Sequence, residues 1–504
     1  MPSKKPPSSS NGKRRWWGLR LLKKLFFFLM ISLAYLGWIQ YSYWAEPIRV
    51  ERDYVSELNR ELLIGAEEDF AWPKYQEILR DMPAFNEDWS QRARGWTGTS
   101  SIPRWESAWP DIDQYLNENA EFLQLIRETS QREILGFRLR AGLKRGGTAL
   151  KDSEASSQKP VVVNVRMDAH IDLQKLALIL DRHARLSFRN GKTQIAFDDL
   201  ISMLNIASHV GQTKALFAQQ LSANIASRSS YTLLELIGED DESISVDDLN
   251  NFLARLQIFQ KKAIPISLSF ARVMIKDFVQ RVYTDNGNGD GHFRLTAYLD
   301  QIGYGRNPMM EIIFEALGSG RYARRKVTEE TLEDLIAKAQ NEVQLEPWNL
   351  KTNSTLVDDL EQLDSHKGKK LIVLTRLFPD VFGPYFMMQY FIQLKDSLRV
   401  VIALKQFKET HQVWPTKLSD LDNDWLQEIP PDRFDGHALR YKLLDGVPIL
   451  YAIGPDQIDD EGEVFELDPA KLDVVHGWRN SIRNVAMYKN YLIPFGDLVL
   501  WTTQ

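Results

Sequence analysis

Residues 25–44 read LFFFLMISLAYLGWIQYSYW, and this segment decides how the rest of the chain is arranged. It contains no charged residue. A helix of this length, rising about 1.5 Å per residue, spans the roughly 30 Å hydrocarbon core of a bilayer. Trp38, Tyr41, Tyr43 and Trp44 gather at its C-terminal end, and such amphipathic rings prefer the lipid–water boundary. The segment therefore predicts a single transmembrane helix over residues 25–44.

The charge that precedes this segment predicts its orientation. Residues 1–24 carry eight basic side chains and no acidic one, namely Lys4, Lys5, Lys13, Arg14, Arg15, Arg20, Lys23 and Lys24. Because basic residues stay on the cytoplasmic side, we expect residues 1–24 to form a cytoplasmic stub. Residues 45–504 would then lie outside the cytoplasm, in the periplasm beyond the inner membrane.

A cleaved signal peptide is the alternative to a membrane anchor. The basic start suits a signal peptide, but the apolar run is long, and Tyr43-Trp44-Ala45 has no A-x-A-like cleavage pattern. The sequence therefore favours an uncleaved signal anchor, with the lipid bilayer as the first partner of this protein.

Composition excludes several classes of function. The formal net charge is −6 and the only basic block is the N-terminal stub, so the chain lacks the basic footprint of a nucleic-acid-binding protein. The chain contains no cysteine, which excludes disulfides, thiolate metal sites and cysteine nucleophiles. Residues 45–504 are long enough for two or three domains with a sizeable core.

Helical periodicity dominates residues 45–383 and predicts an extracytoplasmic α-helical domain. Its clearest example is a first helix whose apolar residues recur at helical spacing, and which Asn190-Gly191 should end: Leu173, Leu176, Ala177, Leu180 and Ala184. A second helix follows, with Ala196, Leu200, Met203, Leu204 and Ala207. A third carries Phe217, Leu221 and Ile225, which we expect to face a neighbouring helix and to be buried.

The spacing of Gly191, Ala196 and Leu200 resembles one half of a tetratricopeptide hairpin. No 34-residue period recurs along the chain, so a true repeat array is not predicted. We therefore expect helical hairpins that are only partly tetratricopeptide-like. Residues 384–504 should form a separate unit, in which the long helix Pro384–Thr410 precedes a small antiparallel sheet.

Residues 285–300, DNGNGDGHFRLTAYLD, contain the first candidate calcium ligands. Asn286, Asn288 and Asp290 take positions 1, 3 and 5 of a calcium loop, and Gly291 takes position 6. Ala297 stands at position 12, where such loops place a bidentate acid. A polar turn between helices is the alternative interpretation.

Asp456, Asp459 and Asp460 are the second set of candidate calcium ligands. They follow a predicted strand, Leu450–Ile453, and Gly454-Pro455 should turn the chain so that the three carboxylates stay close together. Carboxylate oxygens are the ligands that calcium prefers. The alternative is an exposed acidic turn.

The same region resembles a known family. Trp414-Pro415, Leu418 with Leu421, DRFDGHALRY at 432–441 and LYAIGPDQIDD at 450–460 are together similar to the periplasmic tail of the major pseudopilin of type II secretion. The resemblance covers residues 396–463. It implies a long helix packed on a small antiparallel sheet, with a calcium ion holding the last loop.

The chain departs from that family in three places. The apolar segment lies far upstream of the long helix, Lys23 stands where the pseudopilin processing site needs glutamate, and Gln457 replaces the usual glycine of the calcium loop. We therefore expect a pseudopilin-like module at the end of a different protein.

Most of residues 45–504 also resembles an uncharacterised family of membrane-anchored proteins frequent in planctomycete bacteria. The similar segments are AWPKYQEIL (71–79), NENAEFLQLIR (117–127), QRVYTDNGNGDG (280–291) and GPDQIDD (454–460). That family implies no known activity.

Catalytic motifs are missing from the sequence. It has no HExxH, GxSxG, P-loop or Rossmann fingerprint, and no two of its eight histidines have metal-ligand spacing in a helix. We therefore expect a non-catalytic scaffold or partner-binding protein of the cell envelope, with calcium as its one candidate cofactor. The alternative is an envelope hydrolase of glycan or peptide that uses paired carboxylates, because such pairs meet only in the folded chain.

Overall fold

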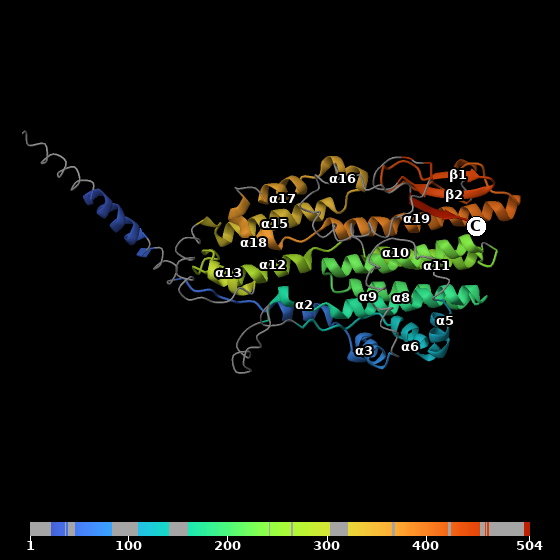
Figure 1. The fold of residues 1–504 in the computed structure, drawn as a ribbon, viewed down its shortest axis with the longest axis horizontal. Coiled ribbons are helices and arrows are strands. Elements are labelled where there is room, and N and C mark those ends of the chain that lie inside the picture. The colour runs from blue at the N-terminus through green and yellow to red at the C-terminus, as the bar shows by residue number, and fades with distance from the viewer. Residues whose placement is uncertain are drawn as a thin grey trace, which may run out of the picture.

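The described part of the chain is mostly helical and ends in a small antiparallel sheet, as predicted (Figure 1). The computed structural model describes residues 22–35, 37–38, 46–82, 109–140, 160–240, 242–263, 266–302, 321–364, 368–421, 425–453, 459, 461–462 and 498–503. The helices are α2 (Tyr54–Leu62), α3 (Trp72–Asp81), α5 (Trp109–Glu118), α6 (Ala120–Ser130), α8 (Asp168–Arg189), α9 (Thr193–Gly211), α10 (Leu216–Glu239), α11 (Val246–Ala263), α12 (Ser269–Val282), α13 (Leu295–Gln301), α15 (Arg325–Glu342), α16 (Pro347–Asn353), α17 (Leu356–Asp364), α18 (Ile372–Leu377) and α19 (Phe382–His411). The strands are β1 (Arg440–Leu444), β2 (Val447–Ala452) and β3 (Leu498–Thr502).

A helix over residues 22–35 stands apart from this body, at the blue end of Figure 1. Its large apolar side chains are all exposed, from 50% at Met30 to 73% at Phe28. Residues 39–44 of the predicted transmembrane segment lie outside the described residues. Among the helices that the structure describes, none has the length and apolar character needed to cross a bilayer.

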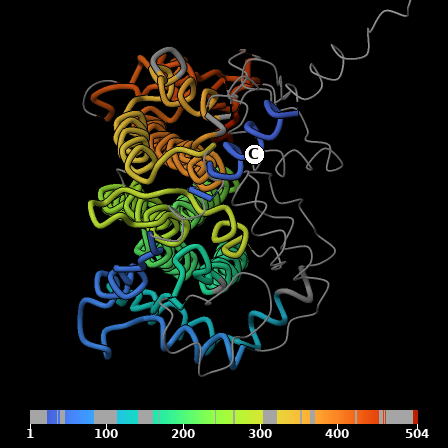
Figure 2. The backbone as a smooth tube through the Cα atoms, turned by 90° about the vertical axis from the view of Figure 1, so that its left-hand side faces the viewer, coloured from blue at the N-terminus to red at the C-terminus, as the bar shows by residue number. Residues whose placement is uncertain are grey.

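The long helices of the body lie side by side in layers, which Figure 2 shows nearly end-on. α8 and α9 form a hairpin, and α10 packs against α9 on one side and against α19 on the other. Gly191 ends α8 as predicted, with φ +68°. Its amide donates to Phe188 O and the Lys192 amide to Ser187 O, which is the Schellman pattern.

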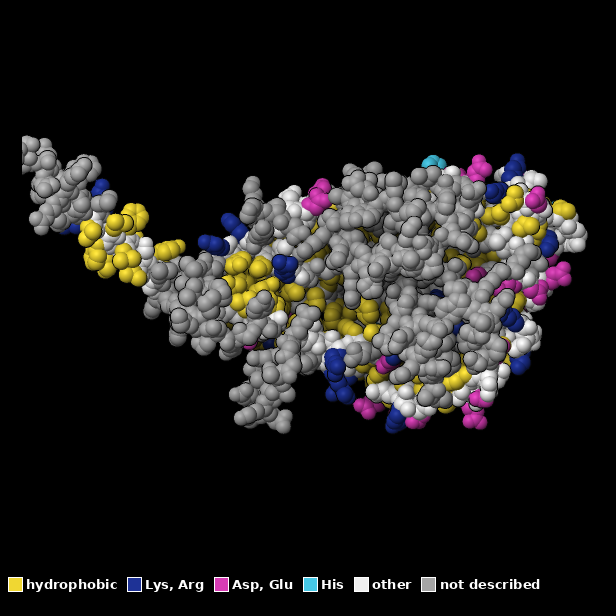
Figure 3. All heavy atoms as spheres, viewed as in Figure 1, with side chains coloured by type: hydrophobic (Ala, Val, Ile, Leu, Met, Phe, Trp, Pro, Cys, Tyr) yellow, Lys and Arg dark blue, Asp and Glu magenta, His cyan; other side chains and the backbone are white. Residues whose placement is uncertain are grey.

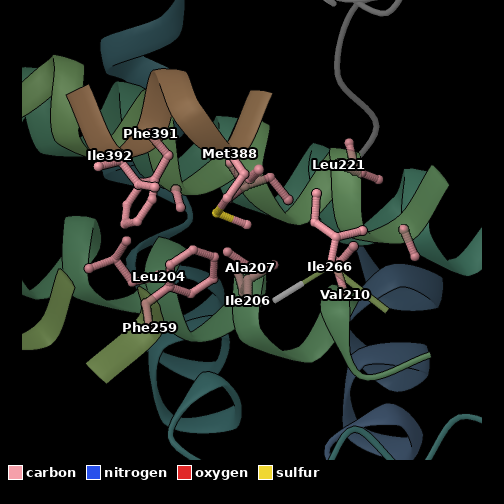
Figure 4. Packing of buried hydrophobic residues seen from close by; sticks show 14 of the residues in the cluster. Leu204, Ile206, Ala207, Val210, Leu221, Phe259, Ile266, Met388, Phe391 and Ile392 are labelled. Atoms are coloured by element: carbon pink, nitrogen blue, oxygen red, sulfur yellow. The ribbon is translucent and has the colours of Figure 1, made fainter. Parts of the chain in front are cut away.

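One core extends through α9, α10, α11 and α19. Figure 4 shows Leu204, Met388 and Phe391 pointing into the same layer from α9 and α19. α19 begins at Phe382 and runs for 30 residues, close to the helix predicted over 384–410.

The predicted burial of the third helix is right at two positions and wrong at one. Leu221 and Ile225 are 7% and 2% exposed, but Phe217 is 46% exposed. Residues four apart in a helix advance by about 40° more than one full turn. Phe217 therefore lies about 80° from Ile225 around the helix axis, and it leaves the buried face at the first turn of α10.

Two local structures depend on side-chain hydrogen bonds. Helices α5 and α6 meet at Asn119, whose side-chain amide donates to the Tyr115 carbonyl at 2.7 Å. The Asn119 backbone amide also donates to this carbonyl at 3.1 Å, so Tyr115 O accepts both a side-chain and a backbone hydrogen bond. Val162–Asn164 form a 3₁₀ turn, and the Val162 amide donates to Asp277 at 2.8 Å.

The sheet has the order β1-β2-β3, and both neighbouring pairs are antiparallel. β3 also packs against α10 and α19. Gly238 makes this approach feasible, because a Cβ there would lie 2.3 Å from the Thr502 carbonyl oxygen. The sheet and the helices therefore share a close contact across the predicted boundary between residues 383 and 384, a boundary that stays a prediction.

Candidate functional site

Three aspartates in the C-terminal part of the chain contact a single arginine, Arg440, which is the first residue of β1. Its Nη1 lies 2.9 Å from Asp432 Oδ2, its Nη2 2.7 Å from Asp435 Oδ2, and its Nε 2.9 Å from Asp459 Oδ2. We call these four residues the Arg440 cluster. One guanidinium here faces three carboxylates, so the cluster carries a formal charge of −2 when all three are ionised.

Asp459 is the one residue of the predicted calcium set 456, 459 and 460 that falls within the described chain; Asp456 and Asp460 lie outside it. Besides Arg440, its carboxylate accepts hydrogen bonds from the Tyr451 hydroxyl at 3.3 Å and the Glu461 amide at 3.1 Å. Donors of the protein itself therefore bind the Asp459 carboxylate.

The turn before β1 is positioned from two directions. Asp432 is fully buried and accepts the Ile453 amide at the end of β2 at 2.9 Å. Gly436 has φ +79°, and a Cβ there would lie 2.8 Å from the Trp348 ring. Only glycine combines this backbone conformation with this close approach, so the FDG sequence places Asp435 beside Arg440.

Arg433 ties the same turn to the helical body. Its amide donates to Gln393 Oε1 at 2.7 Å, and its guanidinium pairs with Glu346 and with Asp396. Because Gln393 and Asp396 belong to α19, Arg433 binds the turn that contains Asp432 and Asp435 to this long helix.

The environments of the two aspartates push their pKa values apart. Burial raises the pKa of Asp432 above the usual range for a carboxyl. Burial acts in the same direction on Asp435, but hydrogen bonds from Arg440 and from the His437 amide outweigh it and hold that pKa below the usual range. Pairs of carboxyls separated in this way are found in acid–base catalysis, and also in structural ion-pair networks.

The first predicted calcium loop is largely satisfied by donors of the protein. Asn286 Oδ1 accepts the amides of Asn288 and Asp290 at 2.9 and 3.3 Å. Asp290 accepts the Lys326 amide at 3.1 Å and Arg324 Nε at 2.6 Å. Asp290 thus binds the start of α15, a link the sequence pattern did not reveal.

A third polar cluster joins α6, α8 and α9. Asp199 is fully buried, and it lies 2.6 Å from Arg127 Nη1 and 2.5 Å from His183 Nδ1. His183 Nε2 in turn lies 3.5 Å from the Ser187 hydroxyl. The order Ser–His–Asp matches that of a hydrolase triad, but Ser187 is only 2% exposed. This arrangement therefore serves to cross-link three helices.

The sequence did not reveal that Arg440 pairs with Asp459 or that Arg324 pairs with Asp290. It did not reveal the cluster around Asp199 either. The i, i+4 spacing of His183 and Ser187 was the one local signal, since it places both side chains on one helix face. Across the ranges that the structure describes, no group of three or more His, Cys, Asp or Glu residues has an arrangement that could hold a metal ion.

Comparison of the chain with protein-family models, with curated proteins and with solved structures finds no match.

Proposed function

We propose that this protein is a membrane-anchored, extracytoplasmic scaffold or partner-binding protein of the cell envelope. One observation carries the proposal. The helix over residues 22–35 stands away from the body and exposes its apolar side chains, yellow in the face shown in Figure 3, in every direction.

An apolar helix with its large side chains exposed is unfavourable in water. Each exposed leucine or phenylalanine side chain would gain about 1.5–3 kcal/mol on leaving water, and the segment of uncharged residues continues in the sequence to Trp44. In a lipid bilayer, hydrocarbon surrounds the apolar side chains of such a helix on all faces, and its backbone hydrogen bonds are made within the helix. The cytoplasmic stub and the inner-membrane location follow from the same basic residues that predict the orientation.

The body offers an extended helical surface to a partner protein. Its long, parallel helices form an extended body with a continuous core (Figure 1). The resemblances to the planctomycete family and to the pseudopilin tail, and the tetratricopeptide-like hairpin, belong to this proposal. They are compatible with an envelope protein that positions others.

Topology is the first test of this proposal. Reporter fusions after Gln504 should be active outside the cytoplasm, and the mature protein should keep Met1 and resist extraction from membranes by alkaline carbonate. Activity of the fusion in the cytoplasm, or a mature N-terminus near Ala45, would contradict the anchor.

Partner binding is tested separately by crosslinking intact membranes and recovering the full chain. Scaffolding is supported if the same envelope protein is recovered in repeated experiments and is not recovered with Gly238→Val, a variant in which the body misfolds. Recovery of the chain alone under all conditions would contradict it.

Calcium at Asp456, Asp459 and Asp460 is part of the proposal. Two formal negative charges in the Arg440 cluster favour the approach of a divalent cation to this loop. Calorimetry of the full chain in detergent should detect heat on addition of calcium, and a chelator should lower the melting temperature. Neither signal should appear in Asp459→Asn; no heat with millimolar calcium would exclude the site.

A second candidate function is an envelope hydrolase that uses paired carboxylates. In the Arg440 cluster Asp432 is fully buried, so Asp435, whose side chain is 16% exposed and whose pKa is lowered chiefly by its hydrogen bond from Arg440, is the carboxylate that would meet a substrate. The purified chain should then release fragments from labelled cell-wall glycan or from peptide. Asp435→Asn should lose that turnover, and Asp247→Asn on α11 is the matched control.

A further inference from the structure

The described chain is fastened to its anchor by a short segment that is itself part of the fold. The Pro47 carbonyl accepts the Asp285 amide at 2.9 Å, and Glu46 accepts the Thr284 hydroxyl at 2.9 Å. Further along, Arg52 and Gln280 exchange two hydrogen bonds, at 3.2 and 2.9 Å. The residues that follow the anchor are therefore held against the end of α12 rather than leading to it as a free linker.

Chain length then places this end of the body close to the bilayer. Two residues, Ala45 and Glu46, lie between Trp44 and Pro47, and the three residue steps from Trp44 to Pro47 span at most about 11 Å. The headgroup layer on each side of a bilayer is about 5–8 Å thick. Thr284 and Asp285 must therefore lie at the level of the headgroups or directly above them when Trp44 is at the interface.

Basic side chains surround this point. Through Asp290, the loop that contains Thr284 and Asp285 holds Arg324 and the Lys326 amide at the start of α15. The Ala323 amide in turn donates to the Lys370 carbonyl at 2.8 Å. We call the exposed set Arg321, Arg324, Lys326 and Lys370 the proximal face.

Acidic groups at this face pair with basic side chains of the same region. Asp290 pairs with Arg324, and Asp285 pairs with Arg325. Glu330 is exposed and lies 4.0 Å from Lys326. Figure 3 shows dark-blue side chains at the end of the body nearest the anchor helix and also at the opposite end. At the proximal face, Arg321 and Lys370 have no carboxylate partner among the described residues, and these two cations suit contact with an anionic surface.

From the tether and the charges together, we propose that the proximal face rests on the anionic headgroups of the bilayer that holds the anchor. The inference depends on the proposed function, because it takes residues 25–44 to span that bilayer. It fixes the body in one orientation, with α13 and α18 next to the membrane and the β-sheet pointing away, at the opposite end in Figure 1. A partner would then meet the sheet end first.

The absence of cysteine in the chain makes the test direct. Lys326→Cys and Val413→Cys each introduce one labelling site in the full chain; Val413 is 60% exposed and follows α19. Each variant is labelled with a fluorophore and placed in nanodiscs that contain a headgroup-nitroxide lipid, with phosphatidylglycerol or with phosphatidylcholine alone. Quenching at position 326 should exceed that at 413 at least threefold, and it should fall at least twofold when phosphatidylglycerol is left out.

Arg321→Glu combined with Lys370→Glu, with the label kept at position 326, tests the role of charge. This variant should lose the dependence on phosphatidylglycerol while it retains its helical circular dichroism signal. Equal quenching at 326 and 413, or quenching at 326 that ignores lipid charge, would overturn the inference. Carbonate extraction of the same samples separates the two proposals. Release of the chain contradicts the anchor itself, whereas a retained chain with an unquenched position 326 contradicts the proximal face alone.

Discussion

The core formed by α9, α10 and α19 is built from apolar side chains, whereas the turn before β1 is held by charges. Phe391 and Leu404 are fully buried in the first region, where stabilisation grows with the apolar area removed from water and depends little on direction. In the second region Arg440 binds three carboxylates at defined positions. The first arrangement tolerates exchange of side chains of similar volume, but the second depends on each partner.

The largest effect is expected in the apolar core. Phe391→Ala should lower the free energy of unfolding by about 3–5 kcal/mol, because the removed ring leaves a cavity between α11 and α19. Phe217→Ala is the matched control, since this ring is 46% exposed and its loss should cost about 0.5 kcal/mol or less. Urea unfolding followed by circular dichroism measures both. Similar losses in the two variants would mean that the register of α10 is wrong.

In the charged region, Arg440→Gln should lower the free energy of unfolding by about 3 kcal/mol, since it leaves the fully buried Asp432 without its cation. Adding Asp432→Asn should restore part of this loss, because no buried charge then remains. The loss should also shrink on acidification: burial raises the pKa of Asp432, so the folded variant takes up a proton before the unfolded chain does. A double variant as unstable as Arg440→Gln alone would contradict this account.

Two buried histidines predict a pH dependence of about 2 kcal/mol each between pH 7 and pH 5. Burial lowers the pKa values of His170 and His209 to about 4. Below pH 6.5 these two histidines bind protons in the unfolded chain but not in the folded chain. Their contribution to the free energy of unfolding is therefore fully present above pH 6.5 and is lost as the pH falls toward 4. Urea unfolding at pH 7, 6 and 5 measures this slope. His209→Gln should reduce it by about half, and an unchanged slope would contradict the assignment.

The smallest effect is expected at the α8–α9 turn. Gly191→Ala should cost about 1 kcal/mol, because alanine resists φ +68° while its Cβ meets no atom within 4 Å. Gly191→Asn should cost less, since asparagine tolerates the left-handed region. The melting temperatures of both variants give the comparison. An alanine variant as stable as the unaltered chain would show that the turn adjusts.

Local patterns predicted the helices well because each one depends on residues within a few turns. The apolar spacing from Leu173 to Ala184 lies within α8. Ser245 likewise caps α11 by a contact three residues away, accepting the Asp248 amide at 3.1 Å. The same reasoning failed at Phe217, because residues four apart drift around the helix axis.

The candidate site could be predicted only as a collection of acids. Asp459 was recognised from its neighbours in sequence, but its partner Arg440 lies 19 residues earlier in the chain. Asp290 pairs with Arg324, which lies 34 residues later. Nothing in the local spacing of these acids indicates which cation will face them.

The sequence by itself determined the apolar segment 25–44, the basic stub, the helical class and the turn at Gly191. Each of these depends on composition or on neighbours a few residues away, so the physical cause is contained in the local chain. Only the tertiary structure decided that Asp432, Asp435 and Asp459 share one guanidinium, that β3 closes against Gly238, and that Pro47 is bound to Asp285. These contacts join segments far apart in the chain, and charge and hydrogen-bond partners become specific only when folding brings such segments within a few ångströms.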